Sequence, residues 1–191
     1  DSPNQRKLIN ESKITGDPKT MYGVMQFDKS DITDNNKSIE ERGLYWISFP
    51  FDVKLVDVFG LGEYGTAWII QYYDGEERAQ KGWFQETATF WKYVMPEDRK
   101  NFVLEANVGY GLALDIEAIE WPHGIEQQNL YFPSKEKIST IDSELTSTTV
   151  EVPAHTCIIE RDDRKTKDSH WNVIGVPSYA DAEDVVSPDG L

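Results

Sequence analysis

Cysteine is nearly missing from this chain of 191 residues, in which Cys157 is the single example. An intrachain disulfide is therefore impossible, and a metal site built only from cysteines is excluded. The core must come from the size of the domain, because no covalent crosslink can supplement it. The cellular compartment stays open, since domains of this size fold without disulfides both inside and outside cells.

Positive charge is also scarce. The chain has 19 Lys and Arg residues against 34 Asp and Glu residues, which gives a formal net charge of −15. A protein that binds nucleic acid needs a basic surface that displaces counterions. The basic run at 161–167 contains Asp162 and Asp163, which cancel much of its charge. We therefore expect no nucleic-acid partner.

Long apolar runs are missing as well. A membrane-spanning helix needs about 20 consecutive apolar residues, and no stretch approaches that length. Residues 1–13 lack the apolar centre of a signal peptide. We expect no membrane span. The chain begins with Asp1 and not with Met, which predicts a segment of a longer protein with neighbouring domains.

Aromatic and β-branched residues are abundant, as in β-sheet proteins. Hydrophobic residues make up 39% of the chain and aromatic residues 12%, which favours sheets over a helical bundle. Short runs of these residues alternate with turn signals, and about ten strands are predicted. We expect an all-β fold, an antiparallel and jelly-roll-like β-sandwich with little helix. The predicted parts are a polar lead-in (1–19), one sandwich domain (20–177) and an acidic tail (178–191).

The stretch 43–82 forms the centre of this prediction. A buried strand is expected over 44–49, because an aromatic and β-branched run there is stopped by Pro50. A second strand is expected over 66–73, followed by a tight turn at Asp74-Gly75. The two strands predict a core hairpin with a glycine-rich excursion between them. Over 112–121, strand and helix are both open interpretations.

A group of aromatic residues after this stretch predicts a binding surface. Aromatic rings stack on the apolar face of a sugar, and neighbouring polar side chains can recognise its hydroxyl groups. Core packing is the competing interpretation for most of these rings. The candidate ligand-binding residues are Trp83, Trp91, Tyr93, Asp74 and Arg78.

The acidic stretch 28–42 invites a calcium hypothesis. Its candidate ligands are Asp28, Asp31 and Asp34. A calcium-binding loop that begins at Asp31 would need glycine at position 36 and glutamate at position 42, where the chain has Asn36 and Arg42. We therefore favour a solvated acidic loop and no metal site, with calcium as the alternative cofactor.

Two other groups of residues could carry chemistry. Two acidic groups could serve a glycan hydrolase. Asp74, Glu76 and Glu77 are expected in one turn, and Asp115 and Glu117 are expected on one side of a strand. His155 and Cys157 would also share one side of a strand. For the acidic pairs we favour a solvated surface, and for Cys157 a buried position. We expect no catalytic residues.

Five short motifs occur in one order between residues 43 and 177. They are WISFPFDV at 46–53, WII with YDG and RA at 68–79, WK at 91–92, VGY at 108–110 and WNVIG at 171–175. In this order they resemble a β-rich module of large secreted or cell-surface proteins of Bacteroidetes-type bacteria. The resemblance implies an extracellular location and supplies no catalytic residues.

The function we expect is therefore that of a non-catalytic binding or structural module, which recognises a glycan or a protein partner at the cell surface. Two alternatives stay open at this point. One is a glycan-active hydrolase that uses paired carboxylates, and the other is a spacer between surface domains. The hydrolase needs two carboxylates about 5 to 10 Å apart in a cleft, whereas the binding module needs exposed aromatic rings on one face of a sheet.

Overall fold

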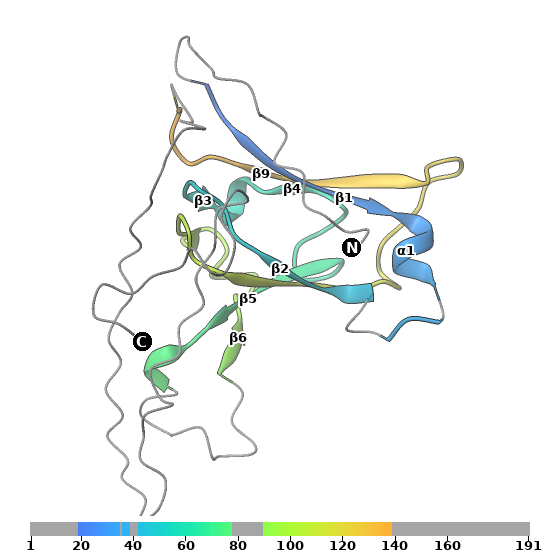
Figure 1. The fold of residues 1–191 in the computed structure, drawn as a ribbon, viewed down its shortest axis with the longest axis horizontal. Helices are drawn as coiled ribbons and strands as arrows, with labels where there is room; N and C mark the ends of the chain where they lie inside the picture. The colour runs from blue at the N-terminus through green and yellow to red at the C-terminus, as the bar shows by residue number, and fades with distance from the viewer. Residues whose placement is uncertain (1–18, 35, 39–41, 78–89, 139–191) are drawn as a thin grey trace, which may run out of the picture.

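The computed structural model describes residues 19–34, 36–38, 42–77 and 90–138 (Figure 1). Two short helical segments lie among them, α1 (Lys29–Thr33) and the 3₁₀ turn η1 (Leu55–Asp57). The strands are β1 (Tyr22–Asp28), β2 (Leu44–Ile47), β3 (Val53–Lys54), β4 (Phe59–Gly60), β5 (Trp68–Tyr73), β6 (Trp91–Tyr93), β7 (Val103–Leu104), β8 (Tyr110–Leu114) and β9 (Gln127–Pro133). The predicted all-β fold with little helix is confirmed over these residues.

The strands form three antiparallel sheets. One sheet has the order β1-β9-β4, a second has the order β2-β8-β5-β6, and β3 pairs with β7 in a small third sheet. Figure 1 shows β1 and β9 running side by side, apart from the group that contains β2, β5 and β6. The arrangement is sandwich-like. A jelly-roll order of strands stays a prediction, as do the strands expected over 145–176, which lie outside the described residues.

The core lies between the two larger sheets. Across it, the ring of Phe27 in β1 meets that of Tyr45 in β2 edge-on, with centroids 5.3 Å apart. Phe49, just after β2, packs on Phe132 of β9 at 4.6 Å. Gly23 makes room for that ring, because a Cβ at this position would lie 2.4 Å from the Phe49 Cε1 atom. Interlocked aromatic rings of this kind contribute burial and favourable ring contacts that hold the sheets together.

Strands β2 and β5 do not form the predicted hairpin. Strand β8 lies between them, so that Trp46 of β2 pairs with Gly111, and Gly111 pairs with Gln71 of β5. The chain between β2 and β5 forms the turn η1 and the strands β3 and β4, and these two strands join other sheets, so β2 and β5 are not joined by a tight turn. The buried strand expected over 44–49 is shorter, ending at Ile47, and is buried on one side only, because Ile47 is buried while the Trp46 side chain is 49% exposed.

Arg99 connects the segment before β4 to strand β5. Its guanidinium donates hydrogen bonds to three backbone oxygens, those of Leu55 (3.2 Å), Val56 (3.4 Å) and Val58 (2.8 Å). The guanidinium carbon also lies 5.0 Å from the ring centre of Tyr64 and 5.7 Å from that of Trp68. A planar cation that bonds carbonyl groups while covering aromatic rings combines two stabilising contacts in one side chain.

Candidate functional site

The four-stranded sheet has one buried face and one outward face, because successive side chains of a strand point to opposite sides. The buried face carries core residues such as Ile47, Trp68, Ile70 and Leu112. The register places nine residues on the other side, and we call them the Trp46 face. They are Leu44, Trp46, Ile69, Gln71, Tyr73, Trp91, Tyr93, Gly111 and Ala113.

Four aromatic rings dominate the Trp46 face. Trp46 and Tyr93, from the two edge strands, are 49% and 52% exposed. Trp91 lies against both Trp46 and Tyr73, with ring centroids 4.8 Å and 5.4 Å apart and interplanar angles of 53° and 59°. Trp46, Trp91 and Tyr73 therefore form a continuous but tilted aromatic group across β2, β6 and β5, and Tyr93 lies on the same face two residues after Trp91.

Glycine at position 111 permits this arrangement. A Cβ there would lie 3.7 Å from the Trp46 Cζ3 atom and 3.3 Å from the Gln71 Cβ atom. The indole of Trp46 therefore lies close over the backbone of β8, and Gly111 is itself buried. A large aromatic side chain that covers a strand glycine compensates for the missing side chain of that glycine. Any larger residue at position 111 would move Trp46 or Gln71.

The acidic residues after β5 are held by a lysine. The Asp74 Oδ1 atom accepts a hydrogen bond from the Glu77 backbone N–H at 2.8 Å. Lys92 contacts both carboxylates, with its Nζ atom 2.9 Å from the Asp74 Oδ2 atom and close to the Glu77 Oε2 atom. Hydrogen bonds to Glu77 first, and then to Asp74, raise the pKa of Lys92 above its ordinary value. This carboxylate pair is occupied by an ammonium group, an arrangement that fixes the end of the β5–β6 pair.

The second acidic pair does not lie on a strand. Strand β8 ends at Leu114, and Asp115 begins a turn in which its Oδ1 atom accepts hydrogen bonds from the backbone N–H groups of Glu117 and Ala118. The expectation of two carboxylates on one strand face is therefore wrong. The Asp115 carboxylate binds the backbone of the turn that it begins, because a short side chain reaches the N–H groups two and three residues further on.

The three calcium candidates have separate partners. Asp28 accepts a hydrogen bond from the Gln127 side chain at 2.7 Å, Asp31 lies 3.8 Å from the Lys37 ammonium, and Asp34 accepts one from the Asn36 N–H. Over the described ranges, no three His, Cys, Asp or Glu side chains gather in a way that could hold a metal ion.

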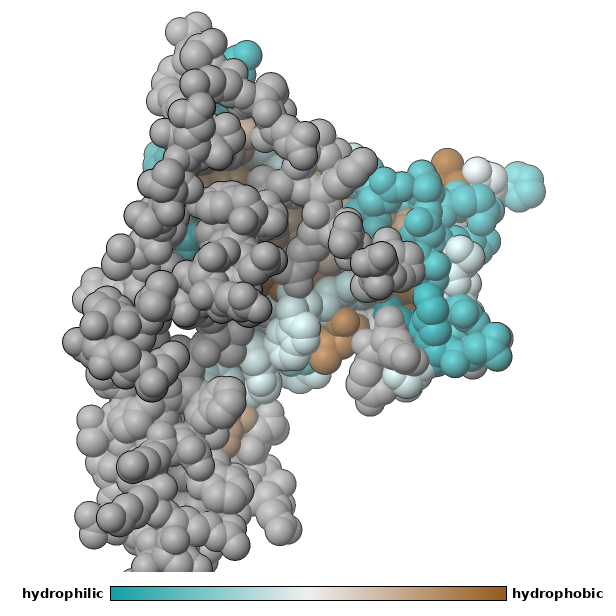
Figure 2. Space-filling view, in the orientation of Figure 1, coloured by the Kyte–Doolittle hydropathy of each residue, from teal (hydrophilic) through white to brown (hydrophobic). Residues whose placement is uncertain are grey.

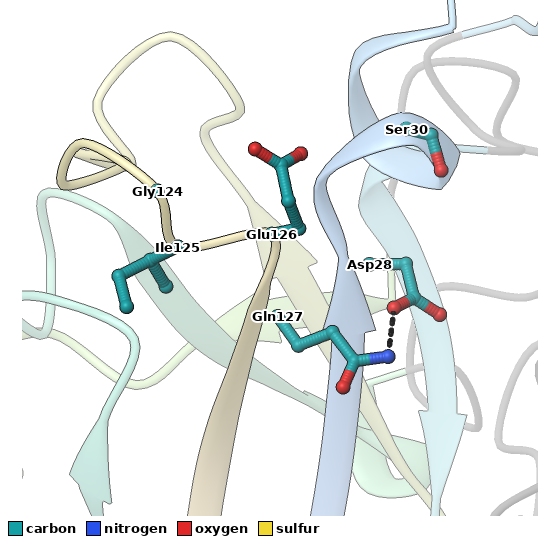
Figure 3. A pocket seen from close by; sticks show the side chains of 6 residues that line it. All are labelled: Asp28, Ser30, Gly124, Ile125, Glu126 and Gln127. Carbon is teal, nitrogen blue, oxygen red and sulfur yellow. Dashed lines mark hydrogen bonds between the residues drawn. The ribbon is translucent and has the colours of Figure 1, made fainter.

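An open pocket of about 400 Å³ lies where β1 ends at Asp28 and β9 begins at Gln127. Figure 3 shows Asp28 and Gln127 pointing toward each other along one side of it. Its remaining lining residues are Ser30, Gly124, Ile125 and Glu126. The surface near α1 is largely hydrophilic in Figure 2. The pocket is thus polar and shallow, and it holds no aromatic ring on which a sugar could stack.

A second aromatic group lies on the outward side of the sheet β1-β9-β4. Phe59 of β4 stacks on Tyr131 of β9 at 4.9 Å and 15°, and it meets Tyr22 of β1 edge-on at 6.5 Å. We call this side the Phe59 face. Its residues are Tyr22, Val24, Gln26, Asp28, Phe59, Gln127, Asn129, Tyr131 and Pro133.

Only some of the predicted site residues lie within the described part of the chain. Trp91 and Tyr93 lie together on the Trp46 face, and Asp74 directly follows its Tyr73. Trp83 and Arg78, together with His155 and Cys157, lie outside the described residues. Sequence reasoning missed Trp46 and Tyr73 as site residues. The strand alternation that exposes Trp46 was available in the sequence, but its neighbours across β8 were not.

Comparison with known proteins adds no name to this geometry. No protein-family model matches the chain, and neither a curated protein nor a solved structure does. No helix over the described ranges has the length and apolarity that crossing a membrane requires.

Proposed function

We propose that the protein is a non-catalytic binding module that recognises a glycan through the Trp46 face, as part of a secreted or surface-anchored bacterial protein. The observation that carries this proposal is the pair of half-exposed rings, Trp46 and Tyr93, on the sheet face that also carries Trp91 and Tyr73. A folded domain buries most large aromatic rings, so several on one outward face favour a binding role.

The chemistry of the face suits a sugar. The apolar C–H side of a pyranose packs on an aromatic ring, while its hydroxyl groups need hydrogen-bonding partners nearby. Gln71 lies in the same row as Trp46 and Tyr93 and supplies an amide, and the two tyrosines supply hydroxyl groups. The face therefore offers stacking surfaces and a few polar groups side by side. The surface location follows the family resemblance and is part of the proposal.

A glycan-array screen of the purified chain tests the proposal, run once with calcium and once with a chelator. We expect binding that Trp46→Ala or Tyr93→Ala weakens by about tenfold or more, because a few stacked rings carry most of the energy of such contacts. Trp91→Ala should weaken binding as well. A signal that depends on calcium would support calcium as a cofactor.

The matched control is Phe59→Ala. Phe59 is 52% exposed, similar to Trp46, but it lies on the other sheet. It should leave glycan binding unchanged. If the folded chain binds no glycan, or if Phe59→Ala weakens binding as much as Trp46→Ala does, the Trp46 face is not the site, and a spacer or protein-binding role takes its place.

A further inference from the structure

We infer that the Trp46 face takes an uncharged, soluble glycan chain, and that it discriminates against acidic polysaccharides and against flat crystalline ones. This inference rests on the proposed function and specifies the ligand class of the same site. Three features carry it, namely the absence of charge at the nine described positions of the face, the negative net charge of the chain and the tilt of the rings.

The face itself is uncharged. All nine outward residues of β2, β8, β5 and β6 are apolar, aromatic or amide residues, in a chain of which 28% is charged. Recognition of a carboxylate or sulfate group in a ligand requires Arg or Lys side chains, which bond these anions directly. None of the nine positions offers one. A neutral sugar needs only stacking and hydrogen bonds, which Trp46, Gln71 and Tyr93 can provide.

The chain as a whole is acidic, with a formal net charge of −15. Lys92, which lies between Trp91 and Tyr93 in β6, points to the opposite side of the sheet and contacts Asp74 and Glu77 there. It therefore supplies no positive charge to the face. An acidic polymer approaching the protein would meet repulsion from its net charge.

The rings do not share a plane. Trp91 is inclined by 53° to Trp46 and by 59° to Tyr73. A crystalline polysaccharide presents a flat layer of chains, and rings tilted this steeply cannot all lie against it. A single chain in solution can rotate about its glycosidic bonds and follow the tilt. The row Trp46–Gly111–Gln71–Tyr93 crosses three strand spacings, about 14 Å, so the surface is long enough for a run of several sugar residues.

Matched polymers test the inference. Affinity gel electrophoresis would compare hydroxyethylcellulose with carboxymethylcellulose, dextran with dextran sulfate, and neutral galactan and mannan with polygalacturonate. A pull-down would use microcrystalline cellulose and chitin. We expect at least one neutral soluble polymer to bind about tenfold more tightly than its acidic counterpart, and the crystalline solids to retain none of the protein. Trp46→Ala should abolish the retardation, whereas Phe59→Ala should preserve it.

The outcomes separate the two proposals. If an acidic polymer or a crystalline solid binds best and Trp46→Ala abolishes that binding, the ligand class is wrong while the proposed function stands. If no polymer binds and the glycan array is also negative, both are overturned. Because far-ultraviolet circular dichroism of Trp46→Ala and Phe59→Ala reports folding, loss of binding through unfolding is recognised in the same experiment.

Discussion

The two outward faces of the molecule differ in how their aromatic rings are arranged. On the Phe59 face, Phe59 and Tyr131 stack on each other at 15°, so each covers one side of the other ring. On the Trp46 face, the exposed rings of Trp46 and Tyr93 come from opposite edge strands, with Gly111 and Gln71 between them. Exposed aromatic rings alone therefore do not define a site. Trp46 is as close to Trp91, at 4.8 Å, but is inclined to it by 53°, so neither ring covers the other as completely as parallel stacked rings do.

The two faces also differ in how many polar residues they carry and where these residues lie. The Phe59 face changes along its strands from aromatic residues at Tyr22 and Tyr131 to amide and acidic residues at Gln26, Gln127 and Asp28. Asp28 and Gln127 bond each other there. The Trp46 face has one amide, Gln71, within an otherwise apolar surface. Aromatic rings around one amide, with the hydroxyl groups of Tyr73 and Tyr93 on the same face, are the arrangement we assign to ligand binding.

The largest effect on stability should come from Gly60→Ala, which disturbs the Phe59 face alone. Gly60 has a φ of +100°, and a Cβ there would lie 2.2 Å from the backbone oxygen of Asn129. Strain and the lost β4–β9 pairing should reduce the free energy of unfolding by about 3 kcal/mol, as measured by urea denaturation.

Gly124→Ala is the control for this substitution. Its φ is similar, at +80°, but no atom lies within 4 Å of the added Cβ. It should cost about 1 kcal/mol, which is the backbone strain by itself. Equal losses in the two variants would show that the contact with Asn129 is relieved by a shift of β4.

The second largest effect should come from Arg99→Leu, which removes the connection between the segment before β4 and strand β5. Three carbonyl groups lose the hydrogen bonds that Arg99 donates, although that of Leu55 keeps the bond from the Val58 N–H, and Tyr64 and Trp68 lose a covering cation. We expect a loss of about 2 kcal/mol in the free energy of unfolding. Arg99→Lys should recover only part of it, because an ammonium cannot bond the same set of carbonyls. Lys100→Leu, at the exposed neighbouring position, should change stability by less than about 0.5 kcal/mol.

The sharpest test of the Trp46 face is Gly111→Ala. The Gln71 Cβ atom, 3.3 Å from the added Cβ, must give by a few tenths of an ångström, whereas the Trp46 Cζ3 atom at 3.7 Å stays at ordinary contact distance. The cost in stability should be about 1 kcal/mol. Affinity for the neutral polymer should fall by about threefold, less than with Trp46→Ala, because Gln71 is displaced while the indole stays in place. If affinity is unchanged while Trp46→Ala abolishes it, the position of Gln71 in the row is unimportant.

Alkaline pH should weaken the four-stranded sheet more than the sheet β1-β9-β4, because the tyrosines with a raised pKa lie in β2, in β8 and against Trp68 of β5. Burial raises the pKa of Tyr45, Tyr64 and Tyr110 to about 12 from an ordinary value of 10.0. The folded state thus holds these protons where the unfolded chain releases them, so their contribution is complete below pH 10 and is lost as the pH rises to about 12. Urea denaturation between pH 8 and 12 should show this decline. The Tyr64→Phe variant, which has no phenol there to titrate, should decline less.

The smallest effect should come from Lys92→Met. The ammonium of Lys92 is partly exposed to solvent, although it contacts Asp74 and Glu77. Exposed ion pairs contribute little, so we expect a loss below about 1 kcal/mol and no loss of affinity for the neutral polymer. A large drop in affinity would mean that the carboxylates take part in binding.

The class of fold could be predicted from the sequence because it follows from local patterns. Aromatic and β-branched runs that end at Pro50 or at Asp74-Gly75 mark strands directly. The pairing could not be predicted in this way. Strand β8 separates β2 from β5, and the reason lies in residues far along the chain, where Gly111 fits beneath Trp46.

The site was predictable in part for the same reason. Trp91 and Tyr93 alternate within one short strand, so their common side can be read from the sequence. Trp46 and Tyr73 reach the same surface only through the order of strands, which no local pattern contains. The partners of the acidic side chains were harder still to predict. Asp74 is bound by Lys92, and Asp115 accepts hydrogen bonds from the backbone N–H groups of Glu117 and Ala118.

The pairing of β1 with β9 has a consequence for how the chain folds. Tyr22 pairs with Pro133, so the first strand must wait for residues more than a hundred positions later before it gains a partner. Contacts that distant in sequence slow folding, because a long loop must close before they form. During synthesis on the ribosome, β1 and the edge of β2 would stay unpaired until β8 and β9 emerge. Such unpaired strands favour aggregation, so slow, cool expression should improve the yield of folded protein.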